Sequence, residues 1–574
     1  MNLPKNISDK IQNSYDEGAY TQVLDEIEKL NGKYNNSPVL LNFVGAAHQQ
    51  LGNIKASIEA FQKALQLKPG CPEILNNLSV CLYQKGDYEN ARIHLSKLIE
   101  KNPDHADAWN NLGLVFANEG KLEAAVNAYE QAISHRSNFP EAFNNMGLAF
   151  KQHGNFEVAI EAFKKAISIQ QNYITAWNNL GLVYFLDNQL NSSIIAYQKS
   201  LTFDPTQHET YHNLAIALHE SGKLTVALDV CKAGLITSPG NLKFLRLAAS
   251  LLRRVIFTVP SQEYQDIILE ILEHKTLVRP NEISQAAISL LKLDPLFKDF
   301  FISGKPNESE VNYIDESLRF VKSPLLQKLM ELCPINDPQL ESIIVKLRAH
   351  ILYELVNNPS KTDLTNFQIS LSLQCFTNEY VYFESDSETK AILNLELDIE
   401  SILHSNKQPT SSQILCLASY RPLGEYKWHE LLQDTIDIEA VYLQQIIEPK
   451  REQKLKSTIR TQDEITDNVS IKVKGQYERN PYPRWTVARI FREAQHVSKN
   501  FEELQLRADM ERLRYLKKPR ILVAGCGTGR HPIESATNYK DAEILAIDLS
   551  LSSLAYAKRK AEEFAIKNIE FMQL

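Results

Sequence analysis

The segment Ile521-Leu-Val-Ala-Gly-Cys-Gly-Thr-Gly-Arg530 decides the fold of the C-terminal part of the chain. Its four leading residues, Ile521–Ala524, form a short apolar run that predicts a buried strand of a parallel sheet. Three glycines follow at alternate positions: Gly525, Gly527 and Gly529. Glycines let a backbone turn sharply and approach a ligand, and a helix predicted over 531–540 would offer N–H groups to a carboxylate or a phosphate. The segment therefore predicts a strand–loop–helix cradle for a nucleotide.

A second strand is predicted from Glu543 to Ile547, and Asp548 follows it directly. A carboxylate at this place can accept charge-assisted hydrogen bonds from both hydroxyls of a ribose. A dinucleotide fingerprint would require glycine at position 530, where this chain has arginine. The chain also contains no Gly-Lys-Ser/Thr tripeptide, which excludes a P-loop. Two interpretations remain open, a different nucleotide-type ligand and a glycine-rich turn that serves packing alone.

The alternating glycines, the second strand and the acidic residue together resemble class I S-adenosylmethionine-dependent methyltransferases. Two further stretches, Asp548–Lys560 and Gln476–Trp485, look like those of a bacterial family that joins tetratricopeptide repeats to such a domain. The resemblance implies S-adenosyl-L-methionine as the cofactor. It also makes Tyr477 and Tyr482 candidates for lining the cofactor site, although both rings can equally pack against a helix N-terminus. Six residues are assigned to cofactor binding: Ala524, Gly525, Gly527, Gly529, Asp548 and Leu549.

A third strand is predicted at Ile569–Leu574. In a doubly wound sheet of order 3-2-1-4-5 the ligand lies at the switch point between strands 1 and 4, and the chain supplies strands 1, 2 and 3. We therefore expect residues 461–574 to be the N-terminal part of an incomplete methyltransferase domain from a longer reading frame. The catalytic base and the acceptor atom are left unassigned.

The N-terminal part of the chain repeats with a period of 34 residues up to about residue 241. Aromatic residues keep this step at Trp109, Phe143, Trp177 and Tyr211, and glycines keep it with Asn188 filling one gap. Together with Trp-x-x-Leu-Gly and a proline that closes many units, the pattern resembles the tetratricopeptide repeat. We predict an α-solenoid of about seven repeats over 1–241, in which the degenerate unit Pro4–Ser37 acts as a cap.

Five asparagines recur at the same 34-residue step: Asn77, Asn111, Asn145, Asn179 and Asn213. First helices of such repeats line the concave groove, and an amide both donates and accepts hydrogen bonds, so it can pair with a peptide backbone of any sequence. The arrangement resembles the asparagine ladder of O-GlcNAc transferase repeats, which implies an extended polypeptide as the partner. The alternative is that each asparagine bonds a neighbouring helix or faces solvent.

Residues 242–460 lose the repeat but keep apolar residues at helical spacing, and we interpret them as a helical spacer or adaptor. The charged and then Thr/Ser-rich stretch Glu448–Val473 predicts a hinge, and the prolines after Tyr477 predict an extended segment. The expected fold class is therefore mainly α: a solenoid, a helical middle region, and the first half of a Rossmann-like α/β domain.

Composition narrows the function classes. A net charge of −8 argues against a general nucleic-acid binder. Seven scattered cysteines without a Cys-x-x-Cys pair favour reduced thiols in the cytoplasm, with no disulfide framework and no metal site. No apolar run reaches the ~18 residues that a membrane span needs, and the polar N-terminus lacks a signal-peptide core.

These observations predict a fragment of an S-adenosylmethionine-dependent methyltransferase whose repeat groove binds an extended polypeptide acceptor or partner. Two alternatives stay open. The chain can be a protein-interaction scaffold with a non-functional methyltransferase remnant, or the acceptor can be a small molecule or glycan while the repeats serve assembly. The oligomeric state is not indicated by the sequence.

Overall fold

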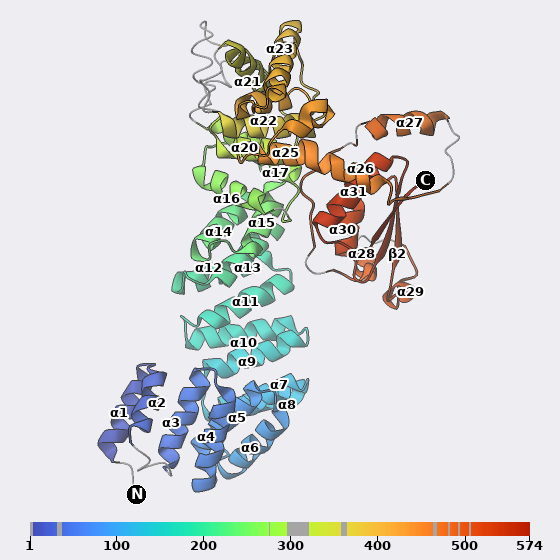
Figure 1. Ribbon diagram of the computed structural model, residues 1–574. Helices are drawn as coiled ribbons and strands as arrows, with labels where there is room; N and C mark the ends of the chain where they lie inside the picture. Colours follow the sequence, from blue (N-terminus) through green and yellow to red (C-terminus); the bar gives the residue numbers. More distant parts are fainter. Residues whose placement is uncertain are drawn as a thin grey trace. The chain divides into compact units, whose positions relative to one another are not determined.

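The computed structural model describes residues 4–30, 37–274, 276–294, 321–357, 364–462, 468–479, 481, 483–491, 494–503 and 507–574. These residues are mainly α-helical, with a small parallel sheet close to the end of the sequence (Figure 1). The predicted fold class, mainly α with a partial Rossmann-like region, is confirmed. The chain forms two compact units, Met1–Ser238 and Pro239–Leu574. The boundary predicted at 460/461 falls inside the second unit.

The first unit consists of helices that pack in consecutive antiparallel pairs, as the 34-residue period predicts. Seven pairs are described, each joined to the next by a short connection: α1 (Lys5–Asp16) and α2 (Tyr20–Glu28), α3 (Pro38–Gln50) and α4 (Ile54–Leu67), α5 (Pro72–Gln84) and α6 (Tyr88–Lys101), α7 (Ala106–Asn118) and α8 (Leu122–His135), α9 (Pro140–Gln152) and α10 (Phe156–Ile169), α11 (Ile174–Leu186) and α12 (Leu190–Phe203), α13 (His208–Glu220) and α14 (Leu224–Thr237).

A single residue with positive φ makes the turn inside each pair. In the sixth pair this residue is Asn188, with φ +59°, and in the other pairs it is a glycine with φ between +73° and +85°. Glycine adopts this left-handed conformation without steric cost, and asparagine is one of the few other residues that tolerate it. The need for a positive φ in this turn therefore explains why the one position that lacks glycine, residue 188, holds asparagine and not a bulkier residue.

The second unit begins with helices and ends with the sheet. Prolines start several of these helices, since the first helical position needs no N–H donor. The helices before the sheet region are α15 (Leu242–Leu252), α16 (Gln262–Glu273), α17 (Pro280–Leu293), α20 (Pro324–Leu332), α21 (Pro338–Asn357), α22 (Thr365–Thr377), α23 (Asp386–His404), α24 (Ser411–Ala418), α25 (Glu439–Tyr442) and α26 (Glu448–Lys456), with short helical turns at Leu423–Glu425, Lys427–Leu431 and Leu443–Ile447.

The hinge predicted over Glu448–Val473 is wrong in its described part. Residues Glu448–Lys456 form α26, and Asn468–Arg479 form α27, so Tyr477 is helical rather than extended. The sequence of α26 has no apolar stripe, but the helix continues directly from the helical residues before it, and two of its glutamates contact a buried cation. Arg559 of the later helix α31 (Leu551–Glu563) bonds Glu452 at 2.8 Å and Glu448 at 3.0 Å.

Four parallel strands form a sheet of order β1-β4-β3-β2. They are β1 (Arg460–Thr461), β2 (Arg520–Ala524), β3 (Glu543–Asp548) and β4 (Ile569–Gln573). The predicted strands correspond to β2, β3 and β4 in the predicted order, whereas β1 was not foreseen because two residues leave no periodicity to detect. Two short helices precede β2, α28 (Val497–Glu503) and α29 (Met510–Arg514), and α30 (Arg530–Asn538) links β2 to β3.

One face of the sheet packs against α30 and α31 (Figure 1). Val523 and Ala546 lie in this core with Ile533 of α30 and Leu554 of α31. Because side chains alternate along a strand, Leu522 points to the opposite face, where it is 60% exposed. The sheet therefore holds the loops at the carboxyl ends of β2 and β3 on a rigid, one-sided support.

Candidate cofactor site

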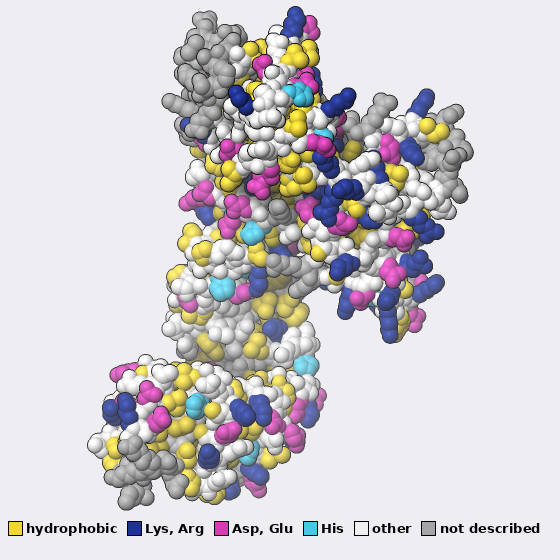
Figure 2. Space-filling view, viewed as in Figure 1, with side chains coloured by type: hydrophobic (Ala, Val, Ile, Leu, Met, Phe, Trp, Pro, Cys, Tyr) yellow, Lys and Arg dark blue, Asp and Glu magenta, His cyan; other side chains and the backbone are white. Residues whose placement is uncertain are grey.

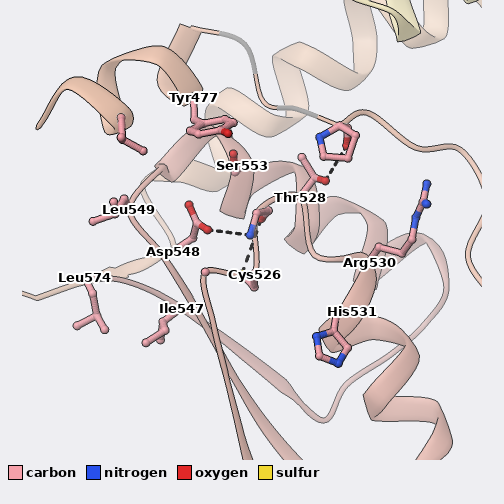
Figure 3. Close-up of a pocket in the computed structure, with 14 residues that line it drawn as sticks. Tyr477, Cys526, Thr528, Arg530, His531, Ile547, Asp548, Leu549, Ser553 and Leu574 are labelled. Carbon is pink, nitrogen blue, oxygen red and sulfur yellow. Dashed lines mark hydrogen bonds between the residues drawn. The ribbon is translucent and has the colours of Figure 1, made fainter. Parts of the chain in front are cut away.

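A cavity of about 700 Å³ opens at the carboxyl ends of β2 and β3 (Figure 3). This edge of a doubly wound sheet is where ligands bind in such folds. The lining residues come from the β2–α30 loop, the end of β3, helices α27, α30 and α31, the segment after α27 and the residue after β4. They are Val473, Tyr477, Pro483, Gly525, Cys526, Gly527, Thr528, Arg530, His531, Ile547, Asp548, Leu549, Ser553 and Leu574.

The glycine loop is held to β3 by its backbone. The Cys526 N–H donates to the carbonyl of Ile547 at 3.0 Å. A Cβ atom placed on Gly525 or Gly527 would meet no protein atom within 4 Å. The backbone at these two positions is therefore open to the cavity, as a loop that cradles a ligand requires.

Asp548 joins the two loops that form the cavity. One carboxylate oxygen accepts from the N–H of Gly527 at 2.7 Å (Figure 3). The other accepts from the N–H of Ser550 at 3.0 Å. A carboxylate has about four lone-pair sites, so both oxygens of this half-buried group retain acceptor capacity. Asp548 can therefore accept hydroxyl groups of a ligand without giving up the hydrogen bonds that orient it.

Two of the six residues assigned to cofactor binding do not line the cavity. Ala524 is the last residue of β2. Gly529, with φ +82°, is the N-cap of α30, and a Cβ there would collide with Ala557 of α31. The structure brings the other four, Gly525, Gly527, Asp548 and Leu549, together at one cavity, whereas Gly529 allows close packing between two helices.

Helix α27 forms one wall of the cavity through Val473 and Tyr477. Tyr477 lies beside Asp548 and Ser553, as the sequence comparison suggested (Figure 3). Tyr482, the other tyrosine predicted to line the site, lies outside the described residues.

Sequence reasoning missed Glu478, which holds α27 at the cavity. Its carboxylate accepts from the N–H of Leu551 at 2.6 Å and from the hydroxyl of Ser552 at 2.7 Å. These N–H groups begin α31, where the helix dipole favours a negative charge. The sequence offered one clue to this contact: the serine-rich segment at the start of α31 indicates a helix N-terminus, and a helix N-terminus attracts a carboxylate.

Cys526 in the glycine loop is not an activated thiol. Burial, assisted by the neighbouring carboxylate of Asp548, raises the pKa of Cys526 to about 12. The thiolate is the nucleophilic form of cysteine, and it is scarcely populated at neutral pH with such a pKa. The residue therefore acts as a small, neutral side chain of the loop.

In the first unit, four of the five predicted groove asparagines donate to an amide oxygen of the preceding repeat. The donor–acceptor pairs are Asn77 to Asn42 (3.2 Å), Asn111 to Asn76 (2.8 Å), Asn145 to Asn110 (3.0 Å) and Asn179 to Asn144 (2.9 Å). Asn213 departs from the series, because Asn178 in the preceding repeat instead bonds Gln207 and Thr210. The alternative interpretation, a bond to a neighbouring helix, thus describes these four residues, although each half-buried amide keeps one N–H and its oxygen for other partners.

Two negative findings apply to the described ranges. Within them, His, Cys, Asp and Glu side chains form no group of three or more that could hold a metal ion. No helix in the same ranges has the length and the apolar character of a membrane span.

Comparison with protein families identifies the two parts of the chain. Tetratricopeptide-repeat models match residues 48–113, 115–154, 149–188, 174–207 and 196–228, and a methyltransferase-domain model matches residues 521–574. The chain therefore joins tetratricopeptide repeats in its N-terminal region to a methyltransferase domain at its C-terminal side, as the sequence resemblance predicted.

One curated relative is a tRNA (guanine-N(7)-)-methyltransferase of Rubrobacter xylanophilus, 36% identical over 87 residues. This match covers 14% of the chain and 39% of the relative, so the chain spans well under half the length of that protein.

Among solved structures, the MamA protein is 24% identical over 30% of the chain and 96% of its own, with a TM-score of 0.26. A thermophilic tetratricopeptide-repeat protein of Thermus thermophilus is 20% identical over 32% of the chain and 99% of its own, with a TM-score of 0.30.

Proposed function

We propose that the protein is an S-adenosylmethionine-dependent methyltransferase that binds its cofactor at the cavity formed by the β2–α30 loop and Asp548. The observation that carries the proposal is the geometry of this cavity. Two glycines with open space in front of them stand beside a carboxylate with spare acceptor capacity. The match of residues 521–574 to a methyltransferase domain supports the same assignment.

The residues present fit the cofactor. Asp548 would accept the ribose hydroxyls, while Leu549 and Tyr477 supply apolar surface for the adenine ring. Gly525 and Gly527 would let the backbone approach the methionine portion. When bound, S-adenosylmethionine supplies a methyl group on a positively charged sulfonium. The protein's task is to hold that group in line with a nucleophile at near-attack distance.

We further propose that the repeats hold an extended polypeptide acceptor or partner. Asparagines at a regular step along successive first helices offer spare amide donors and acceptors, and amides suit a peptide backbone. Seven free cysteines, of which Cys526 is half-buried and the others are buried, fit a reducing cytoplasm as the compartment.

A specific surface feature favours a second acceptor class, RNA. Around α29 the cationic side chains of Arg507, Arg512, Lys517, Lys518 and Arg520 are all exposed. Figure 2 shows Lys and Arg side chains gathered where α28 and α29 lie in Figure 1. Tyr515 within this tract is 79% exposed, and an aromatic ring among cations suits a base and a phosphate backbone. The curated relative is by its name a tRNA methyltransferase.

A transfer assay separates the two acceptor classes. The full-length protein is incubated with methyl-tritiated S-adenosylmethionine, a peptide library and total tRNA, and the label is counted in each fraction. We expect label in the peptides, and we expect Asn111→Ala/Asn145→Ala/Asn179→Ala to reduce it while a far-UV spectrum stays helical. Label in tRNA that disappears with Lys517→Ala/Lys518→Ala would replace the polypeptide by RNA. Absence of label from both fractions would contradict the proposed acceptors.

A further inference from the structure

Three consecutive residues, Arg484, Trp485 and Thr486, connect the helical region of the second unit with its glycine loop. The Arg484 guanidinium donates to Glu379 at 2.9 Å and lies 4.2 Å over the ring of Phe376. The Thr486 hydroxyl donates to the carbonyl of Leu332 at 2.9 Å. Between these two residues, the side chain of Trp485 contacts the glycine loop instead of the helical region. The short segment 484–486 therefore contacts the helical region through Arg484 and Thr486 and the glycine loop through Trp485.

Trp485 holds the glycine loop directly. Its side chain is 1% exposed, and its indole N–H donates to the carbonyl of Thr528 at 3.0 Å. The Thr528 hydroxyl in turn donates to the carbonyl of Pro483 at 2.7 Å. Thr528 stands between Gly527, whose N–H bonds Asp548, and Gly529, which packs on α31. The 483–485 segment therefore holds the loop residue that directly follows Gly527.

The backbone is strained at Glu379, the residue of the helical region that pairs with Arg484. Glu379 and Tyr380 both have positive φ, +61° and +56°, directly after helix α22. Two successive non-glycine residues in this region cost on the order of 1–3 kcal/mol each. Tyr380 is held by its N–H to the carbonyl of Cys375 at 2.8 Å and by its hydroxyl to Ala418 at 3.2 Å. The turn places the Glu379 carboxylate against Arg484.

We propose that Arg484 and Trp485 are positioning residues that set the glycine loop for the cofactor, and that the Glu379 turn of the helical region regulates cofactor affinity through them. The inference rests on the proposed function of the cavity. It assigns the region predicted as a spacer a role in the site, although none of its described residues lines the cavity.

Conservative variants test the connection in the full chain. Trp485→Phe removes the indole N–H and keeps a ring, and Glu379→Gln removes the charge and keeps the shape. Loss of one hydrogen bond or ion pair that orients the loop should weaken S-adenosylmethionine binding about 3- to 10-fold. Arg484→Gln should weaken binding by the same factor. Because Glu379 acts through Arg484, the double variant Glu379→Gln/Arg484→Gln should lose no more affinity than either single variant.

Matched controls lie in the same helical region. Trp428 is a buried tryptophan stacked on Tyr426, and Arg421 pairs with Glu384 at 2.7 Å. Trp428→Phe and Arg421→Gln should lower the thermal midpoint by similar amounts and leave the affinity unchanged. As a readout that needs no cofactor, hydrogen exchange of the 525–530 peptide should accelerate in Trp485→Phe and Glu379→Gln and stay at the wild-type rate in both controls.

The outcomes are distinct. Binding by wild type with equal affinity and equal 525–530 exchange in every variant overturns the inference and leaves the proposed function intact. Absence of binding by wild type up to millimolar cofactor overturns both. Faster exchange throughout the second unit, rather than in the loop, assigns Trp485 a purely structural role and also overturns the inference.

Discussion

At the scale of single residues, the three glycines of the loop have different tasks. Gly525 and Gly527 face open space at the cavity, whereas Gly529 faces Ala557. A sequence pattern that treats the three as equivalent cannot separate them, because the distinction depends on α31, which lies later in the chain. The open space at the first two glycines is compatible with the proposed ligand cradle, whereas the close approach of Ala557 makes the third a packing position.

This difference predicts opposite effects of two substitutions. Gly529→Ala adds a Cβ in collision with α31 at a positive φ, so we expect it to destabilise the fold by about 2–4 kcal/mol. Gly525→Ala incurs only the cost of the positive φ, about 1–2 kcal/mol, but places a methyl group in the cavity. Thermal midpoints and cofactor titrations of both variants check this. A greater loss of stability in Gly525→Ala, or a greater loss of affinity in Gly529→Ala, would contradict the division.

At the scale of elements, local patterns predicted the repeats and the strands β2, β3 and β4, because each has its own periodicity or turn residues. They failed for β1, α26 and α27. These elements have weak patterns of their own and depend on partners distant in sequence, such as Arg559 for α26 and the N-terminus of α31 for Glu478. For the site, Asp548 and the loop glycines could be predicted from their spacing, whereas Glu478 and Trp485 required the tertiary contacts.

The contact between α26 and α31 gives a prediction with a pH dependence. Arg559 is 3% exposed and pairs with Glu448 and Glu452, so Arg559→Ala removes the cationic partner of one buried carboxylate, Glu452, and one half-buried carboxylate, Glu448. We expect a loss of about 3–5 kcal/mol, measured as the opening free energy of α31 amides by native-state hydrogen exchange. The control Arg451→Ala breaks an exposed pair between the same helices, with Glu562, and should lose at most about 1 kcal/mol.

The sign of the pH effect follows from Glu448. Burial raises the pKa of Glu448, and Arg559 opposes that rise. A carboxyl with a raised folded-state pKa stabilises the fold below its unfolded pKa and loses this contribution as the pH rises through the folded-state value. Without Arg559 the folded-state pKa of Glu448 should rise further, so that ionising Glu448 costs the fold more stability. The stability that Arg559→Ala loses relative to wild type should therefore be larger at about pH 7.5 than at about pH 5. An equal deficit at both values would contradict the role of the ion pair.

At the scale of the whole molecule, the chain combines a unit of tetratricopeptide repeats with a unit that contains both helices and the sheet. Arg279, the N-cap of α17, pairs with Glu534 of α30, and Arg484 pairs with Glu379. Together with the ion pairs between α26 and α31, these contacts join the helical region to the sheet region. These contacts all lie within the second compact unit, Pro239–Leu574. On the proposed function, we expect cofactor affinity at the cavity to depend on residues far from the glycine loop.

The most direct test of the central claim is a titration of the full-length protein with S-adenosylmethionine, up to millimolar concentrations, for wild type and two variants. Asp548→Asn removes the carboxylate charge at the cavity. Asp541→Asn, the control, removes an exposed charge at the opposite end of β3, at a positive-φ position that asparagine tolerates. Loss of charge-assisted hydrogen bonds worth about 1.5–3 kcal/mol should weaken binding about 10- to 150-fold in Asp548→Asn, and the control should bind as wild type does. Equal affinities for wild type and Asp548→Asn would contradict the assignment of this cavity to the cofactor.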